Sequence, residues 1–460
     1  MALSPRSDRP FSNQDNEKFI TPLLDDSWEG DRGSPITLTY KINSSSVAYN
    51  NAIKNALQEF SNVGQITFIE TSASSVDFTF GLSSIDSNTL GITYFNSIFP
   101  IGDISIDLSS DFFTDADFAI NEAGYETIIH EIGHGLGLAH PDGNGLWGTP
   151  LSASFNTLDF TLMVPFSDDL GPVTTALGSP STLQFADMAT IQWMYGANNN
   201  YKSGNDVYTF NSKSVSTLWD AGGIDEINAF SSQSSVTINL NDGSSGENSR
   251  IGDAAFWIGP NVVIENVIGG QSSDEITGNE AANILKGFNG NDVIHGNDGD
   301  DFINGNKDND VVYGDFGNDT VRGGKQLDTV FGGSGDDFVA GDRSDDQVFG
   351  GLGHDYIRGG KDNDNVFGES GNDTIYGDKG NDSIYGGTGN DIFVFKEESG
   401  SDIIFDFVSG EDAIQIDLAS INSFADVLAN FSNQTIDFGN GNIVKINDLN
   451  SISEADVLII

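Results

Sequence analysis

A nine-residue repeat dominates the C-terminal half of this sequence. From residue 269 to residue 394 the chain divides into fourteen nonapeptides that each open with Gly, with Asp at the sixth position of thirteen and an apolar residue at the eighth. One unit cannot bury its apolar residue alone, so consecutive units must stack. A disordered linker would not hold this register. The repeat therefore predicts an all-β domain, a parallel β-roll over residues 269–394.

The sixth-position carboxylates predict bound calcium, because Ca²⁺ prefers oxygen ligands and each Gly-rich turn also offers backbone carbonyls. Without the ion, these closely spaced carboxylates repel one another. We therefore expect the roll to fold only at the calcium levels of about 10⁻⁴ to 10⁻³ M that extracellular modules require. The expected calcium ligands are Asp292, Asp301, Asp310, Asp319, Asp337, Asp355, Asp373, Asp382 and Asp391.

The pattern resembles the calcium-binding nonapeptide repeat of RTX proteins, which implies two nonapeptides per turn and alternate units on the same side. On one side every unit keeps Gly at its fourth position. On the other side four of six units lose this glycine, and basic residues recur at the third position: Lys307, Lys325, Arg343, Lys361 and Lys379. We hypothesise that these cations replace some calcium ions against the stacked carboxylates, since a row of like charges needs nearby anions. Solvated side chains without such a role are the alternative.

A second informative segment is TIIHEIGHGLGLAHP, residues 127–141, which holds three of the five histidines. His130 and His134 are four residues apart, so they share one face of a helix expected over about 118–136. Gly137 permits a left-handed turn that returns His140 as a third ligand. Three imidazoles leave one position open for water, which is typical of a catalytic zinc site. Glu131 would act as general base on that water, whose pKa zinc lowers toward ~7 while polarising a peptide carbonyl.

The full HExxHxxGxxH pattern is that of metzincin peptidases. HEIGHGLGLAHP, LQFADMATIQWMYGAN (183–198) and LWDAGGIDEINAF (218–230) resemble segments of serralysins, the secreted zinc proteases of Gram-negative bacteria. The resemblance implies an α/β (α+β) catalytic domain with the zinc helix at the floor of a cleft, and a Met-turn in which Met163 packs beneath the ligands. Where the family has a zinc-ligating tyrosine two residues later, this chain has Pro165. Loss of one such donor can cost ~10²–10³ in rate.

The domain prediction has five parts: an N-terminal tail (1–17), a metzincin zinc protease domain (18–205), a β connecting segment (206–268), the RTX β-roll (269–394) and a C-terminal β cap (395–460). Its final residues, EADVLII, resemble a type I secretion signal. Within the protease domain we expect a helix over 50–64 and strands over 66–71, 75–81, 90–95 and 102–108. The resemblance implies an edge strand that pairs with substrate, and we expect it within the region of the strands over 90–95 and 102–108.

Composition excludes several classes of protein. The net charge of −50 argues against binding nucleic acid. The absence of cysteine excludes disulfides and thiolate metal sites. No run of eighteen apolar residues indicates a membrane span, and the first nineteen residues lack the apolar core of a signal peptide. We therefore expect a secreted, extracellular monomer that leaves its cell through a type I secretion apparatus.

Together these features predict a multidomain, calcium-dependent zinc metalloendopeptidase that hydrolyses proteins and peptides. The alternative is an RTX surface or adhesive binding protein with a degenerate metalloprotease domain. Pro165 favours the alternative, whereas the intact set of Glu131 and three histidines favours the enzyme.

Overall fold

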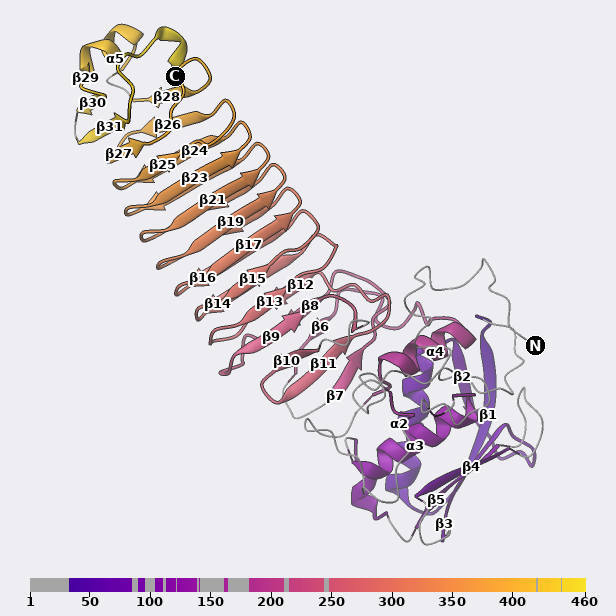
Figure 1. Cartoon of the computed structure of the whole chain (residues 1–460). Coiled ribbons are helices and arrows are strands. Elements are labelled where there is room, and N and C mark those ends of the chain that lie inside the picture. Colours follow the sequence, from indigo (N-terminus) through magenta and orange to yellow (C-terminus); the bar gives the residue numbers. More distant parts are fainter. Residues whose placement is uncertain are drawn as a thin grey trace. The chain divides into compact units, whose positions relative to one another are not determined.

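The computed structural model describes residues 33–84, 90–95, 104–110, 113–120, 122–138, 140, 161–163, 182–210, 215–243, 248–418, 421–439 and 441–460. These residues form two compact units (Figure 1). The first lies within Met1–Asp206, Asn211–Gly223 and Asp242–Val263, and the second within Val207–Phe210, Ile224–Asn241 and Ile264–Ile460. The predicted connecting segment, 206–268, therefore contributes to both units.

A five-stranded sheet organises the first unit, with strand order β2-β1-β3-β5-β4. The edge strand β4 is antiparallel to β5, whereas the other neighbours are parallel. The four predicted strands are confirmed as β2 to β5, whereas β1 was not predicted. The bounds are β1 Ile36–Asn43, β2 Ile66–Glu70, β3 Phe78–Ser83, β4 Gly91–Phe95 and β5 Ile104–Ser109.

Three α-helices accompany this sheet among the described residues: α2 Val47–Val63, α3 Ala123–Gly135 and α4 Phe185–Tyr195. Helix α2 confirms the helix predicted over 50–64 and begins earlier, because the Ser46 side chain caps it by accepting from the Tyr49 N–H. It packs on α3, and α3 packs on β4 and β5.

The histidine-bearing helix α3 is shorter than predicted. Residues Asp115–Phe118 form a separate 3₁₀ turn, η2, in which Asp117 accepts from the Thr114 backbone and hydroxyl. Ala119 and Glu122 are both extended, so the helix cannot start before Ala123. Three short strands complete the first unit: β7 Val215–Leu218, β10 Ser249–Ile251 and β11 Ala254–Ile258.

Two sheets of parallel strands build the second unit, and in each sheet the strands of successive turns lie side by side along the roll (Figure 1). Paired residues in neighbouring strands are 18 apart, as in Val330↔Val348 and Val339↔Ile357, so one turn holds two nonapeptides. One sheet contains β9 Val236–Asn239, β13 Glu275–Thr277, β15 Val293–His295, β17 Val311–Phe316, β19 Thr329–Ser334, β21 Gln347–Leu352, β23 Asn365–Ser370, β25 Ser383–Tyr385 and β27 Ser401–Ile404. The other contains β6 Val207–Tyr208, β8 Glu226–Asn228, β12 Asn266–Ile268, β14 Ile284–Asn289, β16 Phe302–Lys307, β18 Thr320–Arg322, β20 Phe338–Ala340, β22 Tyr356–Lys361, β24 Thr374–Lys379, β26 Ile392–Lys396 and β28 Ala413–Asp417.

The core of the roll is the column of eighth-position side chains, each fully buried between the two sheets. This explains why a unit with one apolar residue is stable only in a stack. The column consists of Ile276, Leu285, Ile294, Ile303, Val312, Val321, Val330, Val339, Val348, Ile357, Val366, Ile375, Ile384 and Phe393, all 0% exposed. The predicted all-β parallel roll is confirmed.

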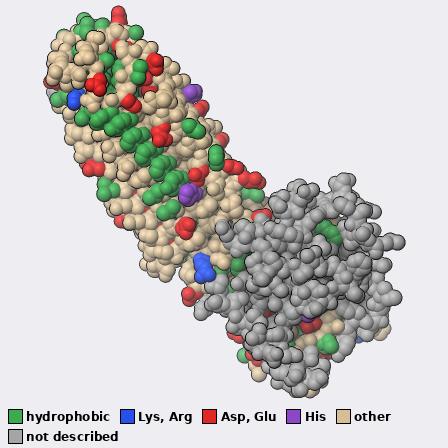
Figure 2. Space-filling view, viewed as in Figure 1, with side chains coloured by type: hydrophobic (Ala, Val, Ile, Leu, Met, Phe, Trp, Pro, Cys, Tyr) green, Lys and Arg blue, Asp and Glu red, His purple; other side chains and the backbone are tan. Residues whose placement is uncertain are grey.

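Hydrophobic side chains also gather in a stripe along the outside of the roll (Figure 2). On one sheet the ninth residues of six nonapeptides, followed by Phe405 beyond the repeats, form a column of rings whose neighbouring centroids are 4.3 to 4.9 Å apart and whose planes are within 13° of parallel. These half-buried rings belong to His295, Tyr313, Phe331, Phe349, Phe367, Tyr385 and Phe405. Ring stacking therefore adds a second continuous contact between turns.

Parallel pairing continues beyond the nonapeptides at the C-terminal end. Strand β31 Asn442–Ile446 pairs with β27, and β32 Val457–Ile459 pairs with β28. Two antiparallel strands, β30 Thr435–Gly439 and β29 Phe431–Ser432, follow β31 in the sheet. The cap was predicted as all β, but it contains a helix, α5 Phe424–Asn430, which the Ser423 hydroxyl caps by accepting from the Asp426 N–H. A short turn, η4 Glu454–Asp456, precedes β32.

Candidate metal centres

Three histidine rings converge at the end of α3. The Nε2 atom of His140 lies 3.1 Å from Nε2 of His130 and 3.0 Å from Nε2 of His134. Tetrahedral zinc with Zn–N bonds of about 2.05 Å places its ligand atoms about 3.3 Å apart, so the spacing fits a zinc ion. Gly137 has φ 98°, the left-handed conformation that the sequence analysis expected where the chain turns toward His140.

Backbone carbonyls orient two of these rings. His130 Nδ1 donates to the Leu162 carbonyl at 2.7 Å, and His134 Nδ1 donates to the Leu138 carbonyl at 2.8 Å. Each Nε2 atom is then the unprotonated nitrogen that faces the other rings. Burial, followed by the charge of His134, lowers the pKa of His130 well below its usual range. His130 therefore offers a neutral imidazole, the form that binds a metal.

Glu131 lies beside this cluster and is buried, with 7% of its surface exposed. The Thr93 hydroxyl, on edge strand β4, donates to Glu131 Oε2 at 2.6 Å. Burial raises the pKa of Glu131 to about 7, against the opposing effect of this hydrogen bond. The strand can approach because residue 91 is glycine: a Cβ there would lie 2.9 Å from Glu131 Cγ. Thr93 was not predicted, since no spacing in the sequence relates it to Glu131.

A buried carboxylate on α4 supports the segment that carries the Leu162 carbonyl. Asp187 accepts from the Thr161 hydroxyl at 2.6 Å and from the Leu162 N–H at 2.8 Å, and it also accepts from the Gln184 N–H. Asp187 is 0% exposed, and burial raises its pKa to about 6. Asp187 was not predicted as a functional residue, although it lies in segment 183–198, which resembles serralysins.

Met163 lies beneath α3 and is 1% exposed. A Cβ on Gly133 would come within 2.7 Å of Met163 Sδ, so the glycine allows this close contact between the helix and the thioether. Pro165, the other residue singled out in this stretch, lies outside the described residues, as does the N-terminal tail 1–17.

The sixth-position carboxylates form two ladders along the roll. In each, Asp Oδ1 accepts from the N–H of the Asp 18 residues earlier, for example Asp337 from Asp319 at 2.7 Å and Asp346 from Asp328 at 2.8 Å. The first Asp ladder is Asp301, Asp319, Asp337, Asp355, Asp373 and Asp391, and the second is Asp292, Asp310, Asp328, Asp346, Asp364 and Asp382.

The second oxygen of every ladder carboxylate is buried and has no hydrogen-bond partner in the described part of the chain. Burial is the largest cause that raises the pKa of these groups, to about 6 for Asp355 and to about 9 for Asp310 and Asp364. Buried anionic oxygens without donors fit a cation with oxygen ligands, so the site chemistry agrees with calcium. Asp328, Asp346 and Asp364, which the calcium prediction left out, have the same geometry as the predicted ligands.

The two ladders differ in the turns beside them. Along the first ladder the fourth residue is always Gly with φ between 122° and 149°, and a Cβ on Gly335 would lie 1.7 Å from the Gly317 carbonyl oxygen. Along the second, two units keep this glycine, whereas Asp308, Gln326, Ser344 and Asp362 occupy the position in the other four with φ between 71° and 81°. The backbone therefore presents its carbonyls differently on the two sides.

The basic residues at the third position do not contact the ladder carboxylates in the described part of the chain. Lys307, Lys325, Arg343, Lys361 and Lys379 are all exposed. Lys307 Nζ instead donates to Asn289 Oδ1 at 2.8 Å, and Lys379 pairs with Glu398. The physical reason is that the third residue lies at the rim of the turn, whereas the ladder carboxylates are buried.

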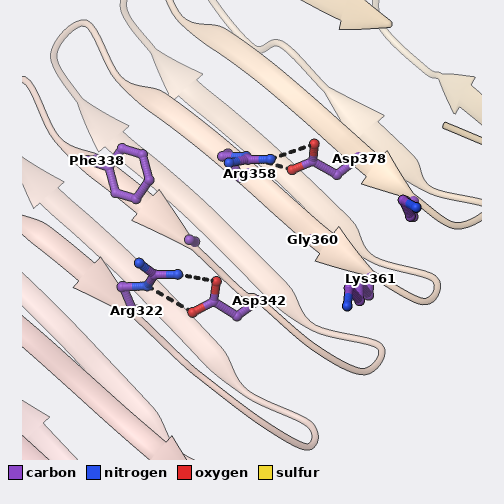
Figure 3. Close-up of a pocket in the computed structure, with 9 residues that line it drawn as sticks. Arg322, Phe338, Asp342, Arg358, Gly360, Lys361 and Asp378 are labelled. Carbon is purple, nitrogen blue, oxygen red and sulfur yellow. Dashed lines mark hydrogen bonds and ion pairs between the residues drawn. The ribbon is translucent and has the colours of Figure 1, made fainter. Parts of the chain in front are cut away.

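Two other arginines pair with acids across turns (Figure 3). Arg322 forms a two-point ion pair with Asp342, at 2.5 and 2.9 Å, and Arg358 forms one with Asp378, at 2.6 and 2.8 Å. Ala340 lies between the two arginines in the sheet register, which leaves a surface pocket of about 280 Å³. Each pair is partly buried and joins residues 20 apart in sequence, so it connects one turn to the next.

Comparison with known proteins agrees with both centres. Residues 28–147 match the matrixin family, described as Peptidase_M10. Residues 268–303, 286–321, 295–330, 322–357 and 358–393 match the RTX calcium-binding nonapeptide repeat. The matrixin domain implies a catalytic zinc ion, and the repeats imply bound calcium.

Three relatives are informative. Metallopeptidase AprA of Pseudomonas marginalis is 32% identical over 263 residues, 50% of this chain and 54% of that protein. Serralysin of Photorhabdus luminescens is 31% identical over 266 residues, 51% of this chain and 53% of the relative. Serralysin of Photorhabdus laumondii is 30% identical over 316 residues, 61% of this chain and 64% of the relative. The chain thus matches about half to two thirds of the length of these proteins.

Proposed function

Because this chain joins a matrixin domain to RTX calcium-binding repeats, we propose that it is a secreted, calcium-dependent zinc endopeptidase similar to serralysins. The observation that carries the proposal is the convergence of His130, His134 and His140 with Glu131 beside them. A structural metal site would not need a buried carboxylate held next to its ligands.

The proposed ligands are the Nε2 atoms of the three histidines. A zinc ion held there would supply the Lewis acidity that activates a water molecule and polarises a peptide carbonyl. Leu162 and Leu138 keep the rings of His130 and His134 in place through their carbonyls. Glu131 accepts the proton of the attacking water and returns it to the leaving amine.

Strand β4 is the proposed binding surface for protein and peptide substrates. It is one of the two edge strands of the sheet, so an extended peptide can add to it through backbone hydrogen bonds. Its residue Thr93 contacts Glu131, so a peptide bound along β4 would lie close to the proposed base.

The roll is the proposed calcium-binding part, with one oxygen of each ladder carboxylate available to an ion. Calcium outside the cell would neutralise the ladders and complete folding there. We further propose export through a type I secretion apparatus and a monomeric enzyme. In the described part of the chain, no helix has both the length and the apolar character needed to cross a membrane.

A binding protein with a degenerate protease domain is the second candidate, favoured by Pro165. Casein hydrolysis by the full chain, refolded in calcium with stoichiometric zinc, distinguishes the two functions when run beside Glu131→Ala. We expect hydrolysis by the parent and none by the variant at equal zinc content. If neither protein hydrolyses casein although both bind zinc and calcium, a function as a binding protein is favoured. The variant Pro165→Tyr would then test whether the missing hydroxyl explains the lack of activity.

A further inference from the structure

Two small residues on neighbouring strands form the floor of the pocket between the Arg322 and Arg358 ion pairs (Figure 3). In the register of the sheet, Ala340 pairs with Arg322 on one side and with Arg358 on the other. Gly360 follows Arg358 by two residues on β22, so these two positions share one face of the sheet. Two turns after Ala340, the equivalent residue is Tyr376. The pocket therefore exists because Ala340 and Gly360 lack the larger side chains of neighbouring turns.

Each side of the pocket is an ion pair that keeps both donors and acceptors for a ligand. Asp342 accepts from Nε and Nη2 of Arg322, and Asp378 accepts from the same two atoms of Arg358. These bonds use two of the five N–H groups of a guanidinium, and a carboxylate has about four lone-pair sites. The side chains of the two arginines are 39% and 44% exposed. Each ion pair is thus fixed in orientation and still open to solvent.

The two arginines lie two turns apart along the roll. Because both make the same contact with an aspartate 20 residues later, their guanidinium groups are about 9–10 Å apart, which is two strand spacings. The hydrogen bonds from Asp342 raise the pKa of Arg322, and the charge of Arg358 opposes this rise. The two positive groups therefore act on the same volume.

The lining of the pocket is positively charged although the chain is strongly acidic. Lys361 and Lys379 are paired in the sheet register and complete the lining. Four basic and two acidic residues line the pocket, a net charge of +2 in a chain of net charge −50. Lys379 also pairs with the exposed Glu398, whereas Lys361 has no ion pair among the described residues. The pocket therefore attracts a negative group that most of the surface repels.

The acceptors in the walls limit which anionic ligand fits. An inorganic anion offers acceptors only, so Asp342 and Asp378 would repel it. A sugar hydroxyl both donates and accepts, which matches walls that contain both kinds of group. At one end of the pocket Phe338, stacked on Tyr356 with ring centroids 5.5 Å apart, adds an apolar surface for the C–H groups of a sugar ring.

We propose that this pocket binds one acidic sugar residue, bearing a carboxylate or a sulfate group, of an oligosaccharide. The sugar hydroxyl groups bond to the two ion pairs, and the acidic group lies beside Lys361 and Lys379. The volume of about 280 Å³ is below the ~300–1,000 Å³ of pockets for drug-sized ligands, as a single sugar ring requires. The inference is independent of the proposed peptidase activity, since all these residues belong to the second unit.

Titration calorimetry of the full chain in saturating calcium tests the proposal. One probe is a tetrasaccharide of alternating glucuronate and N-acetylglucosamine, with its neutral methyl ester as the matched ligand. A sulfated galactose tetrasaccharide is the second probe, and a hexaglutamate peptide tests for attraction by charge alone. We expect at least one acidic sugar to bind about tenfold or more tightly than the ester and the peptide, and the tighter sugar identifies the acidic group. Equal affinity for the acidic sugars and the peptide, or no binding of either sugar, would overturn the inference.

Two variants locate the binding on the chain. Lys361→Gln removes one charge from the lining, and Ala340→Tyr fills the pocket with a side chain that the sheet accepts at Tyr376. Both should weaken binding of the acidic sugar about tenfold. Lys325→Gln, at the same repeat position two turns before Lys361 and outside the pocket, is the control and should bind like the parent. Parental affinity in both Lys361→Gln and Ala340→Tyr would show that the sugar binds elsewhere.

Discussion

Asp187 on α4 orients the ring of His130 through the backbone of one residue, Leu162: the Asp187 carboxylate accepts from the Leu162 N–H at 2.8 Å, and the Leu162 carbonyl accepts from His130 Nδ1 at 2.7 Å. All three residues are at least 97% buried. Helix α4 thus stabilises the orientation of His130, the first proposed zinc ligand, through Asp187.

Replacing Asp187 by Asn should weaken metal binding by about 10- to 100-fold, the usual cost of losing an outer-sphere partner. The amide cannot accept from Thr161, Leu162 and Gln184 as the carboxylate does. Competition with a chelator gives the zinc affinity, and the absorption spectrum of the cobalt-substituted protein reports ligand geometry. Asp117→Asn, at the exposed cap of η2, is the control and should leave both unchanged. Parental zinc affinity in Asp187→Asn would contradict the positioning role.

Replacing Thr93 by Val should lower kcat by about 10- to 100-fold, because the Glu131 carboxylate loses the hydroxyl donor that fixes its orientation. Since Val matches Thr in shape, the fold of β4 and the zinc content should not change. Steady-state peptide hydrolysis separates kcat from KM. Thr93→Ser restores the hydroxyl and should recover most of the activity. If Val and Ser variants behave alike, the hydroxyl has no part in catalysis.

The calcium-free roll should be more stable at acid pH than at neutral pH. An unfolded Asp has a pKa of about 3.9, whereas burial raises the pKa of Asp310 and Asp364 to about 9 in the folded roll. Between these values the folded state binds more protons, so this contribution to stability is complete below about pH 4 and is lost as pH rises through about 9.

Circular dichroism in excess chelator tests this expectation. We expect strand signal to increase as pH falls from 8 to 5, and the calcium concentration needed for folding at pH 8 to exceed that at pH 6. The same titration in saturating calcium is the control, since bound ions replace the protons. Strand content independent of pH without calcium would show that ladder protonation does not limit folding.

A fourth-position glycine should be required where the repeat keeps it, but not in the four units of the second side that carry another residue there. Gly335→Ala places a methyl group 1.7 Å from the Gly317 carbonyl oxygen at φ 138°, so it should cost at least about 2 kcal/mol of unfolding free energy. Ser344→Ala, at the equivalent position on the second side, keeps a backbone with φ 81° that already carries a side chain and should cost under about 1 kcal/mol. Denaturant unfolding in calcium measures both, and equal losses would contradict the difference between the sides.

Much of the functional architecture could be predicted because it is periodic or local. A nine-residue period decides which residue of each unit is buried, and Val330, Val348 and Val366 are accordingly all fully buried. The i, i+4 spacing places His130 and His134 on one helix face, and Gly137 turns the chain toward His140 as expected.

The incorrect or missing predictions involve contacts that no period encodes. The helix of the cap, α5, depends on a local cap at Ser423 within a segment interpreted as strands. The basic residues at the third position share the 18-residue repeat of the carboxylates, yet a shared period does not bring two side chains together. Lys325 and Arg343 lie exposed at the rim, while the Asp328 and Asp346 carboxylates are buried.

The sequence by itself therefore determined the roll, its inward column, the carboxylate ladders and the histidine cluster, because each depends on spacing within a helix or a repeat. Only the tertiary structure decided that Thr93 contacts Glu131 from 38 residues away, that Asp187 supports His130, and that Asp402 continues the second Asp ladder although it follows Asp382 by 20 residues instead of 18. These contacts join segments whose separation is set by how strands and helices pack, and packing depends on the whole chain rather than on any local pattern.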